Sequence, residues 1–118
     1  MRKYYIISLA LFILHALEEY LTHFYSVDWS LNYLSSLINL TPATIWLSLQ
    51  VVGIVLIVIL ISKKNITFLS FILGFVLVFE ITHVLPAITT RSYYSGLLSA
   101  IPILIFSYFY WKKLLKTI

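Results

Sequence analysis

The chain has 118 residues, of which 62% are hydrophobic and only 10% are charged, and its mean hydropathy is +1.03. Soluble domains usually have about a quarter of their residues charged, so this composition excludes a soluble globular protein and indicates one embedded in a membrane. The net charge of +4 does not indicate nucleic acid as a partner, because the basic residues lie beside apolar segments and form no binding stripe. The absence of cysteine excludes disulfides, thiolate metal sites and thiol nucleophiles.

The first apolar segment, residues 4–25, is long enough for a membrane-spanning helix, which needs about 20 mainly apolar residues. Arg2 and Lys3 precede it as in a signal peptide, but the segment contains acidic residues and no small-residue cleavage site, so we interpret it as a retained helix. Residues 26–40 form the longest connection. A short amphipathic helix at the outer membrane interface and a plain loop with aromatic anchors fit this segment equally well, given its apolar residues Trp29, Tyr33, Leu34, Leu37 and Ile38.

Three further apolar segments predict membrane spans at residues 42–61, 66–85 and 93–111. Thr41 is expected to be the N-cap of the second span, with Pro42 at its first helical position. Pro86 is expected to end the third span. Pro102 is expected inside the fourth, where neighbouring helices can satisfy the carbonyl it frees. The chain is therefore predicted to be a single all-α domain, an integral membrane four-helix bundle.

The distribution of Lys and Arg predicts the topology of this bundle. An even number of spans places seven basic residues on one side of the membrane: Arg2, Lys3, Lys63, Lys64, Lys112, Lys113 and Lys116. Only Arg91 falls on the other side. Because basic residues favour the cytoplasm, we expect both termini to be cytoplasmic, and we expect the protein in the cell (plasma) membrane.

Ionisable residues are concentrated inside two of the predicted spans. The first span contains His15, Glu18, Glu19 and His23, and the third contains Glu80 and His83. Each acid costs roughly 2.5–3.5 kcal/mol at the centre of a spanning helix. A purely structural role, in which polar groups hold helices together, contributes on average only about 0.6 kcal/mol per interaction. The cost is therefore better explained by a functional site between helices.

The ionisable residues also share a level along the bundle. Glu18 and Glu80 each lie about 21 Å from the cytoplasmic start of their own span, at ~1.5 Å per residue. The first and third spans run in the same direction, so the two carboxylates are expected at one depth in the outer half. Gln50, about 12 Å from the outer start of the second span, is expected near the same depth.

Imidazole and carboxylate together are ligands for zinc, iron or manganese. Residues three and four apart share a helix face, and the first-choice metal ligands on this basis are His15, Glu19, Glu80 and His83. Glu80 and His83 have the Glu-x-x-His spacing of di-iron and di-manganese bundles. Those bundles draw ligands from four helices, whereas these residues come from two, so a mononuclear site with a spare carboxylate fits equally well.

Three further residues are expected to take part in catalysis. Glu18 is the candidate acid/base, and His23 is expected nearer the entrance of the site. Arg91 could neutralise an anionic substrate head group at the mouth of the site. An interfacial role for Arg91, among Tyr93 and Tyr94, is the alternative.

The letters HALEE, residues 15–19, resemble the signature of the HXXEE-domain family, small membrane proteins of four predicted helices whose activity is not established. The resemblance covers nearly the whole chain. It implies that the functional core consists of His15, Glu18, Glu19 and His83, and it implies no substrate.

A second part of the family pattern follows the histidine late in the third helix. It is an Arg/Tyr stretch leading to a Pro-Gly step that opens the last helix. In this chain Arg91, Tyr93 and Tyr94, followed by Ser95-Gly96, resemble this part of the pattern. Serine stands where the family has proline.

These features lead us to expect a metal-dependent membrane enzyme that acts on a lipid-like or hydrophobic substrate by hydrolysis or a redox step. Its partners would be membrane lipids. One alternative is a metal-free lipid isomerase in which Glu and His shuttle protons. Another is a small ion- or proton-coupled transporter, which would need a homo-oligomer because four short spans enclose little, although no pair of interrupted helices is evident. Haem ligation by His15 and His83 is a minor fourth option.

Overall fold

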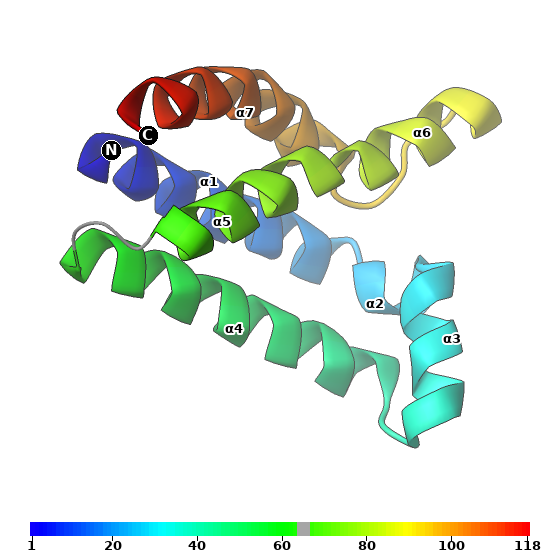
Figure 1. Ribbon diagram of the computed structural model, residues 1–118. Coiled ribbons are helices and arrows are strands. Elements are labelled where there is room, and N and C mark those ends of the chain that lie inside the picture. Colours follow the sequence, from blue (N-terminus) through cyan, green and yellow to red (C-terminus); the bar gives the residue numbers. More distant parts are fainter. Residues whose placement is uncertain (64–66) are drawn as a thin grey trace.

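The computed structural model describes residues 1–63 and 67–118, and helices account for most of this part of the chain (Figure 1). They are α1 (Arg2–Leu21), α2 (Phe24–Val27), α3 (Trp29–Ile38), α4 (Pro42–Ser62), α5 (Thr67–Phe79), α6 (Ile81–Thr90) and α7 (Leu97–Thr117). Four helical stretches are long and apolar enough to cross a membrane: α1, α4, α5 with α6, and α7. The all-helical class and the number of candidate spans agree with the sequence prediction.

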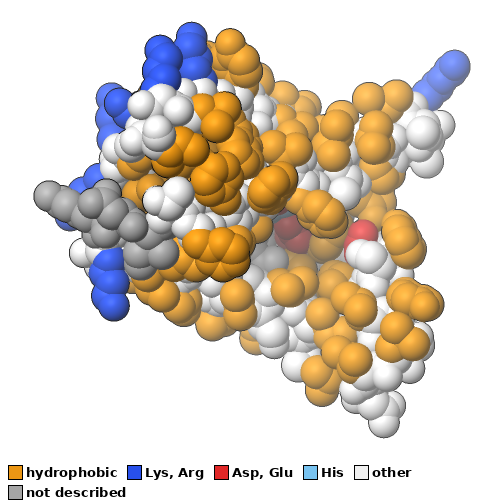
Figure 2. Space-filling model, viewed as in Figure 1, with side chains coloured by type: hydrophobic (Ala, Val, Ile, Leu, Met, Phe, Trp, Pro, Cys, Tyr) orange, Lys and Arg blue, Asp and Glu red, His pale blue; other side chains and the backbone are white. Residues whose placement is uncertain are grey.

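The long helices alternate in direction, so both termini and the α4–α5 connection lie at one end of the bundle (Figure 1). Figure 2 shows Lys and Arg side chains gathered at this end, which we call the basic end. Among the described residues its members are Arg2, Lys3, Lys63, Lys112, Lys113 and Lys116. Lys64, also expected here, lies outside the described residues. The gathering of positive charge at one end is as predicted.

Two predicted helix boundaries are wrong by about one turn and are corrected at left-handed backbone positions, and the last helix also continues to Thr117, beyond its predicted end at residue 111. The first helix ends at Leu21, earlier than predicted, because the chain turns at His23, whose φ is 55°. The last helix starts at Leu97, later than predicted, after Gly96 with φ 88°. In the second span the expected start is confirmed, since the Thr41 hydroxyl accepts from the backbone N–H of Thr44.

The third span differs from its prediction at Pro86. The expected start at Ile66 lies outside the described residues, and α6 continues through Pro86 to Thr90. Proline removes only one bond of the helical ladder, and a helix packed in a bundle tolerates that loss. The interruption instead falls at Glu80, between α5 and α6, where the N–H of His83 donates to the carbonyl of Glu80 at 3.0 Å.

The connection after α1 contains a helix, α3, so the helix alternative is correct in its secondary structure and the loop alternative is wrong. Asp28 caps this helix, α3, by accepting from the N–H of Leu31 at 3.0 Å. Leu31 is buried against Ile45 and Trp46 of α4. Figure 1 shows α3 lying across the far end of α4, opposite the basic end.

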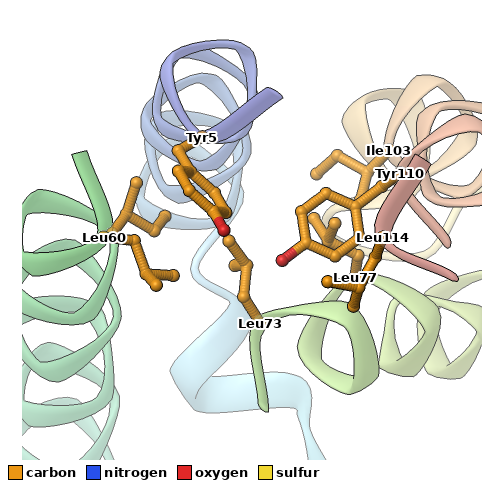
Figure 3. Packing of buried hydrophobic residues seen from close by; sticks show 8 residues of the cluster. Tyr5, Leu60, Leu73, Leu77, Ile103, Tyr110 and Leu114 are labelled. Carbon is orange, nitrogen blue, oxygen red and sulfur yellow. The ribbon is translucent and has the colours of Figure 1, made fainter. Parts of the chain in front are cut away.

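A hydrophobic core fills the half of the bundle nearer the basic end (Figure 3). Its members are Tyr5, Ile57, Leu60, Leu73, Leu77, Ile103, Tyr110 and Leu114. Figure 3 shows the hydroxyls of Tyr5 and Tyr110 directed into the space between α1, α5 and α7. The Tyr5 hydroxyl lies 2.7 Å from Ser70 Oγ, and the Tyr110 hydroxyl donates to the carbonyl of Ser70 at 2.7 Å. This packing fixes α1, α5 and α7 beside one another and so aligns the polar residues farther along them.

Candidate functional site

Four ionisable side chains converge at the level of the interruption between α5 and α6. This ionisable cluster consists of His15 and Glu19 from α1, Glu80 at the interruption and His83 from α6. His15 Nε2 lies 2.5 Å from Glu19 Oε1 and 2.7 Å from Glu80 Oε2. His83 Nε2 lies 3.3 Å from Glu80 Oε2 and 3.8 Å from Glu19 Oε1. The structure therefore brings together the four residues that the sequence singled out as metal ligands.

The ionisable cluster is shielded from the surroundings. The side chains of His15, Glu19 and His83 are only 3%, 5% and 6% exposed, and that of Glu80 is 12% exposed. Figure 2 shows acidic side chains in the recess where α4 and α6 diverge. Charged groups at this burial require partners of opposite charge, because removing them from water is costly.

Both histidines of the cluster are hydrogen-bonded through their Nδ1 atoms. His83 Nδ1 lies 2.6 Å from the carbonyl oxygen of Ser95, which can only accept, so this nitrogen donates. His15 Nδ1 lies 2.7 Å from Ser99 Oγ. The Ser99 hydroxyl in turn donates to Glu18 Oε1 at 2.5 Å. Both imidazoles are therefore held on their Nδ1 side, and both direct Nε2 at the carboxylates of the cluster.

The carboxylate of Glu19 is oriented in the same way. Its Oε2 accepts from the indole Nε1–H of Trp46 at 2.7 Å, which leaves Oε1 for the cluster. Within the described part of the chain, His15 Nε2 and Glu80 Oε2 are buried with no hydrogen-bond donor assigned to either, and they lie 2.7 Å apart. Two acceptor atoms this close need a positive charge between them, either a proton or a metal ion.

Gly96 forms the wall behind both imidazoles. Its φ of 88° is one that side chains rarely allow, and a Cβ there would lie 2.6 Å from His83 Nδ1 and 2.9 Å from His15 Cε1. The two rings meet edge to face, with centroids 4.7 Å apart. The Ser-Gly step before the last helix was the sequence signal for this position, and only the structure shows that it contacts the cluster.

Glu18 lies on a different side of α1 from the cluster and binds the start of α7. Its carboxylate accepts from the backbone N–H groups of Leu98 at 3.0 Å and Ser99 at 2.7 Å. It also accepts from the hydroxyls of Ser99 and Tyr93. Consecutive residues of a helix point about 100° apart, so Glu18 and Glu19 cannot both face the cluster. The two acids of the motif thus have different neighbours.

The structure does not bring His23 or Arg91 to the ionisable cluster. His23 is the exposed N-cap of α2, and its Nδ1 lies 3.1 Å from the hydroxyl of Tyr25. Arg91 is the exposed residue that ends α6, with φ 53°. Their expected catalytic roles find no support in this placement.

Aromatic residues cover the side of His83 that faces α2. The ring centroid of Phe24 lies 4.8 Å from that of His83, and the Tyr94 centroid lies 6.1 Å away. The Tyr94 hydroxyl donates to Asp28 Oδ1 at 3.1 Å. Burial, together with the nearby Asp28 carboxylate, raises the pKa of Tyr94 to about 12, so its phenol keeps its proton and holds the α6–α7 connection against α3 at neutral pH.

Trp46 and Ser99 were missed by the sequence analysis, which noted Ser95 only as the residue that replaces a proline of the family pattern. The expected polar group of the second span was Gln50, whereas Trp46, one turn earlier, supplies the hydrogen bond. Nothing in a single sequence distinguishes this tryptophan from the interfacial aromatics that are common near helix ends.

Replacing Trp46 with phenylalanine is expected to leave Glu19 Oε2 buried without a donor while keeping most of the aromatic packing. If the cluster binds a metal ion, its affinity should fall about 10–100-fold, as is typical when a group that orients a ligand is lost. Metal competition with a chromogenic chelator would measure this. An unchanged affinity would show that the Trp46 hydrogen bond does not orient Glu19.

The fold and the cluster together define a class of small helical proteins. Their helices are long and apolar enough to span a membrane, and they enclose buried imidazoles and carboxylates. The family model "Protein of unknown function with HXXEE motif" matches residues 6–111, so the chain belongs to the HXXEE family. His15, Glu18 and Glu19 are the motif residues. No curated protein and no solved structure matches the chain.

Proposed function

We propose that this protein is a metal-dependent membrane enzyme acting on a lipid-like or other hydrophobic substrate. The observation that carries the proposal is the convergence of four donor atoms: His15 Nε2, His83 Nε2, Glu19 Oε1 and Glu80 Oε2. The side chains of His15, His83 and Glu19 each make a hydrogen bond through their other polar atom, which leaves the donor atom free to bind a metal. Such outward support is typical of metal ligands.

The cluster fits a divalent metal by donor type and spacing. Ligand atoms ~2.1 Å from a tetrahedral metal ion lie roughly 3.4 Å apart. The four imidazole–carboxylate separations here run from 2.5 to 3.8 Å. The nearest atoms of His15, Glu19 and His83 all lie within 4.8 Å of one another. Two imidazoles and two carboxylates suit zinc, iron or manganese, and two carboxylates would neutralise the charge of a divalent ion.

A metal ion here would act as a Lewis acid and could activate water if it keeps a coordination position beyond its protein ligands, which would fit a hydrolytic or a redox reaction. The four protein ligands would orient it, while Phe24 and Tyr94 exclude water on one side of His83. In this proposal His15, Glu19, Glu80 and His83 hold the metal. The placement of Glu18 supports a positioning role in place of acid/base catalysis.

The same proposal includes an orientation. The basic end would face the cytoplasm, as the positive-inside rule favours, and both termini would then be cytoplasmic. The ionisable cluster lies toward the opposite end and would fall in the outer half of the cell membrane. The recess between α4 and α6 opens sideways (Figure 2), so a substrate already dissolved in the bilayer would reach it without entering water. This access supports a lipid-like substrate.

The metal content of the purified protein tests the proposal directly. Mass spectrometry of protein purified in detergent should find stoichiometric metal in the wild type and in the His23→Ala variant. Most of the metal should be lost in His15→Ala, because His15 contributes a central ligand, whereas His23 is exposed and its side chain contacts Tyr25 instead of the cluster. If the wild type contains no stoichiometric metal, including after incubation with zinc, iron or manganese, the proposal is wrong.

One observation favours a second candidate, a metal-free lipid isomerase. His15 Nε2 lies within 2.7 Å of two carboxylates, as a protonated imidazole shared between them would. Such a group could donate and accept protons on a bound lipid. This candidate requires that lipid turnover by the reconstituted protein survive chelation, whereas a metal-dependent enzyme should lose activity and regain it with one specific metal.

A further inference from the structure

Ser99 lies between the motif residues Glu18 and His15. Its hydroxyl donates to Glu18 Oε1 at 2.5 Å and accepts from His15 Nδ1 at 2.7 Å. The same carboxylate accepts from the N–H groups of Leu98 and Ser99, which belong to the first turn of α7. Four groups in sequence are thus linked from the start of α7 through Glu18 and Ser99 to His15.

The groups at the α7 end of this chain of hydrogen bonds determine which atom donates in each bond. The first N–H groups of a helix can only donate, and they carry the positive end of its dipole, so Glu18 is held there as a carboxylate. A carboxylate that only accepts forces the Ser99 proton toward itself. Ser99 Oγ is then left with lone pairs for His15, whose Nδ1 must bear the proton.

We propose that Glu18 and Ser99 form a positioning pair: Glu18 orients the Ser99 hydroxyl, and Ser99 holds the proton on His15 Nδ1, so that His15 Nε2 faces the ionisable cluster. This explains why the motif contains two adjacent acids. Glu19 belongs to the cluster itself, and Glu18 fixes the histidine that precedes it by one turn. The consequence for metal affinity rests on the proposed function, but the hydrogen bond does not.

The hydrogen bond can be tested in metal-free protein by ¹⁵N–¹H NMR of histidine-labelled wild type and Ser99→Ala. In the wild type the proton on His15 Nδ1 should resonate far downfield and exchange slowly, whether or not Nε2 is also protonated. In Ser99→Ala the downfield shift should be lost and exchange should quicken at least about tenfold, while Glu18 keeps its two backbone donors. Ser99→Thr keeps a hydroxyl and should restore the signal.

His83 provides the internal control, because its Nδ1 donates to the backbone carbonyl of Ser95 and should be unchanged in Ser99→Ala. The proposal is overturned if His15 Nδ1 carries no proton in the wild type, or if its signal is the same in Ser99→Ala. A general loss of structure would instead change the NMR signal of His83 as well, and Ser99→Thr would not restore either signal.

Zinc competition on the same variants gives the second arm. Ser99→Ala should bind zinc about 10–100-fold more weakly than the wild type, and Ser99→Thr should bind within a few-fold of it. No zinc binding by the wild type would contradict the proposed function while leaving the NMR result to decide the positioning pair. Equal zinc affinity of wild type and Ser99→Ala, with a wild type that binds, would contradict the positioning pair alone.

Discussion

Replacing Gly96 with alanine should remove metal binding and destabilise the fold. The new Cβ would lie 2.6 Å from His83 Nδ1 and 2.9 Å from His15 Cε1, so both imidazoles would have to move out of the cluster. The left-handed backbone at φ 88° adds a strain of about 1–3 kcal/mol for a residue with a side chain. We expect metal affinity to fall by more than about 100-fold. Chelator competition and unfolding in detergent would measure the two effects.

Gly53→Ala is the matched control, because it is the same substitution at another crowded glycine. A Cβ at Gly53 would meet the ring of Phe12, a side chain outside the cluster, and Gly53 has ordinary helical backbone. This variant should lose some stability and keep its metal. If Gly96→Ala binds metal as tightly as the wild type, the two histidines do not depend on the wall that Gly96 forms.

Replacing Glu18 with alanine should cost about 2–4 kcal/mol in the free energy of unfolding. The substitution removes the acceptor of two backbone N–H groups at the start of α7 and of the hydroxyls of Ser99 and Tyr93. Hydrogen bonds to a charged group contribute about 1.5–3 kcal/mol each, and water replaces part of what is lost where the site is half exposed. Reversible unfolding in mixed detergent micelles would measure the change.

Glu18→Gln distinguishes the effect of losing the negative charge from the effect of losing the whole side chain. Glutamine keeps one acceptor oxygen for the N–H groups of α7 but no longer favours the donation from Ser99. We expect a smaller loss of stability than in Glu18→Ala. If the two variants are as stable as the wild type, Glu18 does not hold α1 to α7.

Tyr93 strengthens the argument for Glu18 as an anchor. Burial, and then its hydrogen bond to the Glu18 carboxylate, raise the pKa of Tyr93 above the ordinary value for tyrosine. The phenol therefore remains a donor at neutral pH. The carboxylate is surrounded by donors from the α6–α7 connection and from α7, which is the environment of a helix cap and not that of a free acid/base.

The sequence by itself determined much of this protein. Apolar lengths predicted four spans, Thr41-Pro42 predicted the start of α4, and the charge pattern predicted which ends of the helices lie together. The spacing of Glu80 and His83 on one helix, and of His15 and Glu19 on another, predicted that each pair shares a face. These properties are local, because they depend on helical periodicity and on the cost of burying charge.

Only the tertiary structure decided which face meets which neighbour. The sequence placed both Glu18 and Glu19 at the expected site. In the packed bundle Glu18 instead binds the start of α7, whereas Glu19 accepts from Trp46 and belongs to the cluster. The approach of Gly96 to both histidines likewise is a contact between residues far apart in the chain. A single sequence records the preferences of each helix but not the packing between helices, which selects among them.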